Sequence, residues 1–317
     1  MQRWRGLEPL PGNWGRCVVT IGIFDGVHRG HQRLIGTAVE QARKQGVPSV
    51  VMTFDPHPAE VVRPGSHPAQ LTSLRRRAEL VQELGVDVFC VIPFTQELAR
   101  MPADEFVHEL LVDQLHVATV VVGENFTFGH RAAGDVALLN RLGRRFGFTT
   151  EGTELLSTER VTFSSTYVRS CVAAGDVGEA AAALGRPHRL EGVVIRGEGR
   201  GRDLGFPTAN LSTAPHAAVP ADGVYACLFG HRKRTEPHPA RVRPAAVSVG
   251  TNPTFSGSER RVEAFVLDAD EDFYGEHVEL DFVERLRDME RYDSVDALVE
   301  QMERDVVRTR ELVGEGR

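Results

Sequence analysis

The sequence predicts an α/β domain with a parallel sheet, followed by an antiparallel β barrel that ends in a helix. The chain has 317 residues, which is enough for about two domains with separate cores. Strand-sized apolar runs alternate with amphipathic helical segments in the first half. Short strand patterns separated by turn residues follow, so we expect one domain at 1–185 and the other at 186–317.

The first half contains apolar segments with the length of buried strands, and helical patterns lie between them. The predicted strands are 17–24, 49–54, 87–92, 117–122 and 148–156. Helices are expected over 74–84, which Gly85 ends, and over 103–115, which Pro102 begins. Strands that alternate with helices in this way form a parallel, Rossmann-like sheet covered by helices.

The alternation of strands and helices stops where a short helical segment, 180–185, ends before Pro187. The predicted strands are now 190–196, 223–229, 241–249, 261–267 and 277–282, with Gly, Pro and Asn in the gaps. This spacing is typical of a small closed antiparallel barrel. Apolar residues at helical spacing between Val295 and Leu312 predict a last helix, with Asp293 or Ser294 as its cap.

The composition excludes several classes of protein. Hydrophobic residues make up 41% and charged residues 26%, which excludes a disordered or collagen-like chain. The net charge of −7 argues against a dedicated nucleic-acid binder. No apolar run approaches the roughly 18 residues of a membrane helix, and the N-terminus lacks the apolar core of a signal peptide. The 4 cysteines form no CxxC pair, so we expect reduced thiols in a cytoplasmic protein. From the charge and the lack of long apolar runs, we expect that this protein binds neither nucleic acid nor membrane.

The first chemically informative segment is 25–31, which follows a predicted strand and leads into a predicted helix from about Gln32. Helix N-termini favour phosphate, and Gly30 leaves room for a nucleotide beside the backbone. His28 and His31 could donate hydrogen bonds to phosphate oxygens whose charge grows in a transition state. The alternative is two polar residues that only cap the helix. Neither GxxxxGK[ST] nor GxGxxG occurs, which argues against a P-loop ATPase and an ordinary dinucleotide dehydrogenase.

Two further segments of the first half suit a ligand. A hydroxyl-rich run at 164–166 precedes Arg169 by about one helical turn, which suits a triphosphate, although such runs are also plain helix caps. Phe126 and Phe128 face the same way in an extended segment, so they could bracket a flat ring or fill the core. His57, held between two prolines, could touch a ligand or fix the turn.

A second constellation lies between residues 190 and 210. Glycines alternate with arginines over 196–202, and such an arch can close over phosphates with its amides and guanidinium groups. A mobile, solvated loop is the alternative. Thr208 and Asn210 share one face of an extended segment, where two oxygen ligands suit Mg²⁺ if water and phosphate complete its shell.

The longer segments of the first half resemble those of the prokaryotic bifunctional riboflavin kinase/FAD synthetase family. GIFDGVHRGH at 22–31, FDPHP at 54–58, VGENFTFG at 122–129 and SSTYVR at 164–169 occur in the family's order. The resemblance implies that His28 and His31 act in adenylyl transfer. It also implies that ATP and its phosphates are bound by Gly22, Phe24, Asp25, Gly30, Ser164, Ser165, Thr166 and Arg169, and flavin by Phe54, His57, Pro58, Asn125, Phe126 and Phe128.

The second half resembles the riboflavin kinase part of the same family. The matching segments are GRGRDLGFPTAN at 199–210, GVYA at 223–226, SVGTNPTF at 248–255, RVEAFVLD at 261–268 and DFYG at 272–275. By this resemblance Gly199 and Arg202 bind ATP, Thr208 and Asn210 hold Mg²⁺, and Glu263 is the general base. A glutamate on a barrel strand is by default a solvated outer residue, and Asp268 and Asp222 are alternative carboxylates.

The resemblance implies two successive reactions. Riboflavin and ATP give FMN and ADP, and FMN and a second ATP give FAD and pyrophosphate. The first nucleophile is a neutral hydroxyl, which benefits from a base, whereas the second is already an anion and needs alignment and charge stabilisation. Mg²⁺ is expected at both steps, and the resemblance is compatible with a homo-oligomer.

Two other functions compete with this interpretation. A nucleotidyltransferase with a different acceptor would share the HxGH segment, but it would leave the whole second domain unexplained. A nucleic-acid-binding barrel is supported only by the basic cluster at 231–234, which we interpret as a solvated hairpin loop. Residues 212–222 are assigned no function.

Overall fold

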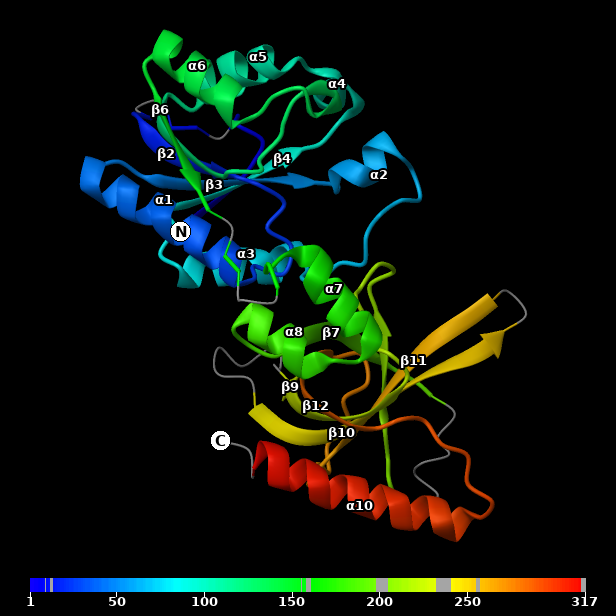
Figure 1. Ribbon diagram of the computed structural model, residues 1–317. Helices are drawn as coiled ribbons and strands as arrows, with labels where there is room; N and C mark the ends of the chain where they lie inside the picture. Colours follow the sequence, from blue (N-terminus) through cyan, green and yellow to red (C-terminus); the bar gives the residue numbers. More distant parts are fainter. Residues whose placement is uncertain are drawn as a thin grey trace. The chain divides into compact units, whose positions relative to one another are not determined.

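The computed structural model describes residues 1–8, 10–11, 14–154, 156–157, 161–197, 205–231, 241–254 and 257–314. The chain forms two units (Figure 1), one of Met1–Pro68 and Thr72–Ser164 and the other of Ala69–Leu71 and Ser165–Arg317. The predicted boundary near residue 185 remains a prediction about functional domains. Packing instead divides the chain at 164/165, because α7 (Ser165–Ala174) packs on α8 (Val177–Leu184) and α8 packs on barrel strands.

The first unit is built on a six-stranded parallel sheet with the order β1-β4-β3-β2-β5-β6. Its strands are β1 (Gln2–Arg5), β2 (Cys17–Ile21), β3 (Ser49–Asp55), β4 (Val88–Pro93), β5 (Val117–Gly123) and β6 (Thr149–Thr153). Strand β1 was not predicted. From β2 the chain continues to β3 on one side and later adds β5 on the other. Ligands of open α/β sheets bind at the carboxyl ends of the strands at such a switch point.

Helices cover both faces of this sheet. They are α1 (Arg29–Gln45), α2 (Pro58–Val62), α3 (Leu74–Glu83), α4 (Gln96–Arg100), α5 (Ala103–Phe106), η1 (Val107–Gln114), η2 (His130–Ala132) and α6 (Val136–Phe146). Side chains alternate along each strand, so Val51 belongs to the same core cluster as Ile35 of α1, whereas its neighbour Met52 belongs to the cluster that contains Leu111 of η1 and Leu139 of α6. The helix predicted over 103–115 continues from α5 as the π-helix η1.

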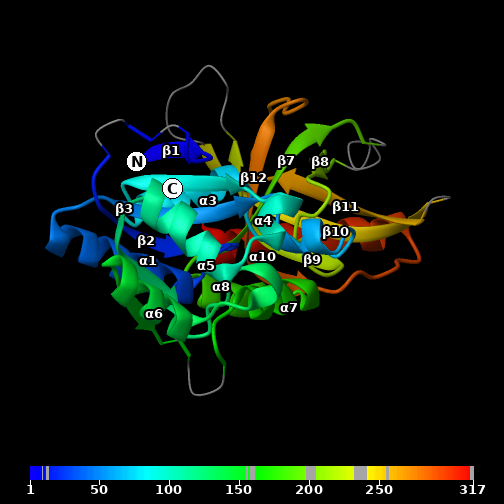
Figure 2. The same ribbon diagram turned by 90° about the horizontal axis from the view of Figure 1, so that it is seen from above.

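The second unit contains a closed antiparallel barrel with the order β10-β11-β8-β7-β12-β9. Figure 2 labels each of these strands. Its strands are β7 (His188–Ile195), β8 (Ala209–Thr213), β9 (Gly223–His231), β10 (Arg241–Thr254), β11 (Gly257–Val266) and β12 (His277–Arg287). The terminal helix α10 (Val295–Val313) is capped by Ser294, whose side chain accepts a 3.2 Å hydrogen bond from the Ala297 N–H. Ala209, Leu211, Val262 and Ala264 belong to the barrel core, so the residues between them face outward.

Candidate functional site

The two histidines of the first unit lie where β2 leads into α1. His28 is the N-cap of α1, and its Nδ1 accepts a 3.4 Å hydrogen bond from the His31 N–H. The two imidazole rings stack with their centroids 3.6 Å apart, and the ring of Phe24 meets the His31 ring edge-on at 5.2 Å. His28 therefore caps the helix, which is one of the two roles considered for it. In this position the rings of His28 and His31 lie together at the positive end of the α1 dipole.

Gly30 allows the backbone of a distant segment to approach this corner. A Cβ at Gly30 would lie 3.1 Å from the His28 ring and 3.4 Å from the carbonyl oxygen of Phe163. The segment that ends at Ser164 therefore runs beside the first turn of α1. A side chain at position 30 would press on the His28 ring, and the predicted approach of a nucleotide to Gly30 stays a prediction.

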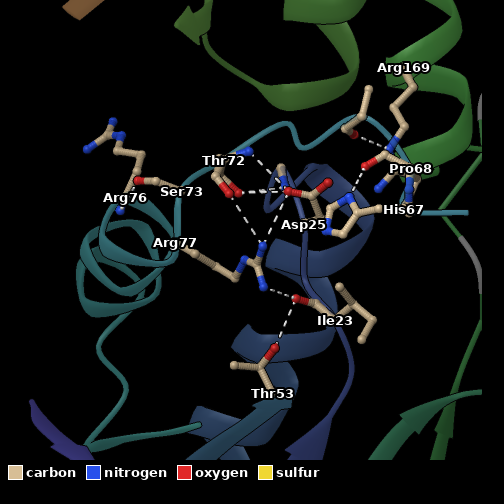
Figure 3. Close-up of polar contacts among 12 residues, drawn as sticks. Ile23, Asp25, Thr53, His67, Pro68, Thr72, Ser73, Arg76, Arg77 and Arg169 are labelled. Atoms are coloured by element: carbon tan, nitrogen blue, oxygen red, sulfur yellow. Dashed lines mark hydrogen bonds and ion pairs between the residues drawn. The ribbon is translucent and has the colours of Figure 1, made fainter. Parts of the chain in front are cut away.

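The carboxylate of Asp25 is turned into the interior of the first unit (Figure 3). Its Oδ1 accepts hydrogen bonds from the N–H and the hydroxyl of Thr72, at 3.0 and 3.1 Å, and lies 3.4 Å from Nη2 of Arg77. Its predicted part in ATP binding stays a prediction. Thr72 and Arg77 lie 47 and 52 residues away in the sequence, so no local pattern could have paired them with Asp25.

A largely apolar cavity of about 730 Å³ opens near the carboxyl ends of β2 and β3, a size that suits a small molecule. The predicted residues that line it are Gly22, Phe54, Pro58, Phe126 and Phe128. Five further residues line it that no sequence signal singled out, namely Phe94, Leu98, Phe106, His130 and Arg131.

Two of the predicted flavin residues are placed elsewhere. His57 does not line this cavity but caps α2, since its Nδ1 accepts a 3.1 Å hydrogen bond from the Ala59 N–H. Asn125 lies in the exposed turn after β5 and is also outside the lining. The turn-fixing alternative therefore describes the observed contact of His57, and the assignment of both residues to flavin remains a prediction.

Phe126 and Phe128 share one side of their segment, as predicted, but they do not bracket a space. Their rings are stacked with centroids 5.5 Å apart and an interplanar angle of 15°. Aromatic partners in direct contact have centroids about 4.5–7 Å apart, so a third ring cannot lie between these two. Phe128 is buried and contacts Phe106 at 5.7 Å, whereas Phe126 is partly exposed. A flat ligand can meet only the outer part of this stack.

The hydroxyl-rich segment is divided between the two units. Ser164 ends the first unit, whereas Ser165, Thr166 and Arg169 belong to the second, on α7, which begins within the predicted run 164–166. The Nε of Arg169 donates a 2.7 Å hydrogen bond to the carbonyl of Ala69, which the second unit also contains.

In the second unit, barrel register brings Thr208, Asn210 and Glu263 together. Asn210 lies directly opposite Glu263 in the antiparallel pairing of β8 with β11. The hydroxyl of Thr208 lies 3.4 Å from Oε2 of Glu263, within donating distance. All three residues are partly exposed and face outward, because Ala209, Val262 and Ala264 take the inward positions.

The two alternative carboxylates are held by structural contacts. Asp268 makes a two-bond ion pair with Arg310 of α10, with both distances 2.7 Å, and the hydrogen bond from Arg310 lowers the pKa of Asp268. Asp222 accepts bonds from the N–H and hydroxyl of Thr251 and from Arg260, at 3.0–3.1 Å. Glu263 is therefore the carboxylate that stands beside the predicted metal ligands.

A glycine packs directly against one of these ligands. A Cβ built on Gly197 would lie 2.2 Å from Nδ2 and 2.8 Å from Oδ1 of Asn210. The Asn210 amide can therefore occupy its position only because Gly197, the first glycine of the predicted arch, has no side chain. Gly199 and Arg202, which were predicted to bind ATP, lie outside the described residues.

Two cavities adjoin the barrel site. One, of about 440 Å³, is lined by Thr208 and by residues 269–274. The other, of about 870 Å³, is lined by Gly197, Asn210 and several arginines, which are Arg169, Arg196, Arg260 and Arg261. Each of the two predicted metal ligands therefore lines a different cavity.

The basic cluster at 231–234 begins inside the barrel rather than in a loop. His231 is a buried residue of β9, and its ring contacts that of Phe273 at 5.1 Å. The other three members lie outside the described residues. The interpretation of the whole cluster as a solvated loop is therefore wrong for His231, which packs in the barrel.

Comparisons with known proteins agree with the resemblance stated for each half of the chain. The FAD synthetase family model matches residues 10–167, and the riboflavin kinase family model matches residues 184–313. The bifunctional riboflavin kinase/FMN adenylyltransferase of Escherichia coli strain K12 is 36% identical over 299 residues, 94% of this chain and 93% of that protein. The protein of the same name from Pseudomonas fluorescens is 37% identical over 313 residues, 98% of each chain.

A solved structure shares the fold over almost the whole chain. It is described as a macrolide-efflux protein from Streptococcus pneumoniae, and it is 32% identical with a TM-score of 0.87, covering 98% of this chain and 99% of that one. Among the residues described here, no helix is both long and apolar enough to cross a membrane. The matched family models and the relatives of nearly equal length place this chain in the family of bifunctional riboflavin kinase/FMN adenylyltransferases.

Proposed function

We propose that the two activities of this enzyme, riboflavin kinase and FMN adenylyltransferase, depend on two separate sets of residues. Glu263, Thr208 and Asn210 would serve the kinase on the barrel. His28 and His31 would serve adenylyl transfer at the N-terminus of α1. The observation that carries the proposal is the grouping of each set inside one unit, by register in the barrel and by ring stacking at the helix.

In the kinase step, Glu263 would act on a proton. The terminal hydroxyl oxygen of the ribityl chain attacks the γ-phosphorus of ATP, its proton passes to the Glu263 carboxylate, and ADP leaves with the electrons of the broken P–O bond. Glu263 is partly exposed and faces out of the barrel, so a substrate hydroxyl can reach it. A positioned carboxylate has this role in other kinases.

Thr208 and Asn210 fit Mg²⁺ in kind and placement. A hydroxyl and an amide oxygen are hard ligands, and Mg²⁺ usually takes one or two protein oxygens while water and phosphate complete its shell. When bound, the ion would neutralise phosphate charge, while Gly197 keeps the Asn210 amide in position.

In the adenylyl step, no base is needed. A phosphate oxygen of FMN attacks the α-phosphorus of a second ATP, and pyrophosphate leaves. Two anions must be brought together, so the protein must supply positive charge and hydrogen-bond donors. The stacked rings of His28 and His31 lie at a helix N-terminus that provides both. The neighbouring cavity, lined by Phe54 and Phe126, would take the flavin ring.

The test is to separate the two activities by mutation. The double variant His28→Ala/His31→Ala should lose FAD formation by at least about 10²-fold while FMN formation stays within about twofold of the parent. Glu263→Gln should lower the FMN rate by about 10²-fold or more and leave FAD formation from supplied FMN unchanged. Chromatography of the flavins during incubation with Mg²⁺-ATP measures both rates. Loss of both activities in either folded variant would contradict separate sites.

A further inference from the structure

The loop that carries the histidines has an unusual backbone. Three of its residues have positive φ, Phe24 at 53°, Gly26 at 81° and Val27 at 40°. A glycine tolerates this region, but a β-branched valine and a phenylalanine do so only where the surrounding structure holds them. Something outside the loop must therefore keep residues 23–28 in place.

The segment that begins at Thr72 and continues into α3 provides that support (Figure 3). The hydroxyl of Thr72 accepts a 3.0 Å hydrogen bond from the Gly26 N–H and donates to Asp25, so it holds two successive loop residues. Arg77 donates a 2.8 Å bond through Nη1 to the carbonyl of Ile23 and pairs with Asp25 through Nη2. Thr53 of β3 donates a second bond, 3.0 Å long, to the same carbonyl.

These contacts are buried, and each of them ends on the loop. The side chains of Arg77 and Asp25 are only 5% and 3% exposed. A buried ion pair is a poor device for stability alone, because the cost of removing both charges from water offsets much of their attraction. The network instead fixes the carbonyl of Ile23, the carboxylate of Asp25 and the N–H of Gly26, two to five positions before His28 in the sequence.

We propose that Thr72 and Arg77 are positioning residues for adenylyl transfer, which hold the strained loop so that His28 and His31 meet the reacting phosphates. This inference rests on the proposed role of the two histidines. A loop shift would move both rings together, because they stack on each other and His31 also contacts Phe24. A misplacement of about 1 Å can cost about 10²-fold in rate.

The test compares Arg77→Met with Arg76→Met, the same change one residue earlier on α3. Arg76 is also shielded, with 15% of its side chain exposed, but its ion pairs are with Glu79 and Glu83. We expect Arg77→Met to lower kcat for FAD formation by about 10²-fold with KM for FMN changed less than about threefold. Arg76→Met should keep kcat within about twofold. Riboflavin phosphorylation by the same molecules reports on the second unit and should not change.

A second substitution separates positioning from general destabilisation. Arg77→Met leaves a buried carboxylate without its guanidinium, and Asp25→Asn removes that charge while keeping an oxygen that accepts from Thr72. The pair Asp25→Asn/Arg77→Met should regain at least about tenfold in kcat over Arg77→Met alone. All rates are measured below the onset of thermal unfolding of each variant. If Arg77→Met does not fold, Thr72→Val, which removes one hydroxyl, replaces it with the same expected split between kcat and KM.

The inference is overturned if Arg77→Met, or Thr72→Val in its place, keeps adenylyl transfer within about twofold of the parent. It is also overturned if the loss of kcat equals that of Arg76→Met, or if the pair Asp25→Asn/Arg77→Met regains thermal stability without regaining kcat. Should His28→Ala/His31→Ala leave FAD formation intact, the proposed function fails instead. The two failures are therefore distinguishable.

Discussion

Replacement of Gly197 by alanine is the sharpest probe of the barrel site, because the structure gives the size of the disturbance. The new Cβ would lie 2.2 Å from Nδ2 and 2.5 Å from Cγ of Asn210. Non-bonded atoms settle at about 3.5–4.0 Å, so the amide must move by roughly 1 Å. A displacement of that size at a reacting centre costs about 10²-fold, or about 2.7 kcal/mol of transition-state stabilisation.

The assay follows riboflavin phosphorylation as a function of Mg²⁺ concentration at saturating ATP. Gly197→Ala should lower kcat/KM for the kinase by about 10²-fold and raise the Mg²⁺ concentration for half-maximal rate, since Asn210 is a proposed ligand. FAD formation from supplied FMN should stay unchanged, because the histidines lie in the first unit.

The control is Gly178→Ala on α8, in the same unit. A Cβ there has no atom within 4 Å, so both activities should be unchanged and the free energy of unfolding should rise by up to about 1 kcal/mol. The reasoning is refuted if Gly197→Ala keeps the parent's kinase rate and Mg²⁺ dependence. It is equally refuted if Gly178→Ala loses as much kinase activity as Gly197→Ala.

Two other predictions use the pKa shifts. Asp268→Asn should leave both activities within about twofold of the parent, since Asp268 pairs with Arg310. The hydrogen bond from Arg310 lowers the pKa of Asp268, so the small stabilisation of the fold by this pair should be present above pH about 4 and vanish as the pH falls through the lowered pKa. Thermal unfolding of parent and variant between pH 2 and 7 checks this, and a difference that grows toward low pH would contradict it. Burial raises the pKa of Cys17 and Cys90 to about 12, so both thiols should resist alkylation of the native protein at pH 8, as peptide mapping would show, whereas labelling faster than unfolding would contradict it.

The sequence determined the fold class and the order of the chemical segments. Buried parallel strands are nearly continuous apolar runs, so β3 to β5 were predicted within about one residue at each end. Local signals also predicted a helix start within 164–166 and a cap at Asp293 or Ser294, and the structure begins α7 at Ser165 and caps α10 with Ser294. Such features depend on residues a few positions apart, which a sequence displays directly.

Other features carried too little local signal. Strand β1 has the sequence QRWR, with one buried residue, and becomes a strand only because β4 offers it a parallel partner. The switch from α5 to the π-helix η1 changes which carbonyl each N–H meets, as the 3.1 Å bond from the Leu115 N–H to the Leu110 carbonyl illustrates. Hydrophobic spacing does not resolve that change over two turns.

The sites divide in the same way. Motif resemblance identified His28, His31, Thr208, Asn210 and Glu263 as candidates, but only the tertiary structure decided what each one touches. Asn210 lies opposite Glu263 only because β8 pairs with β11 in this register, although the two residues are 53 positions apart in the sequence. The stacking of Phe126 on Phe128 and the burial of Asp25 against Arg77 are likewise decided by packing, because long-range partners depend on how whole elements meet rather than on neighbouring residues.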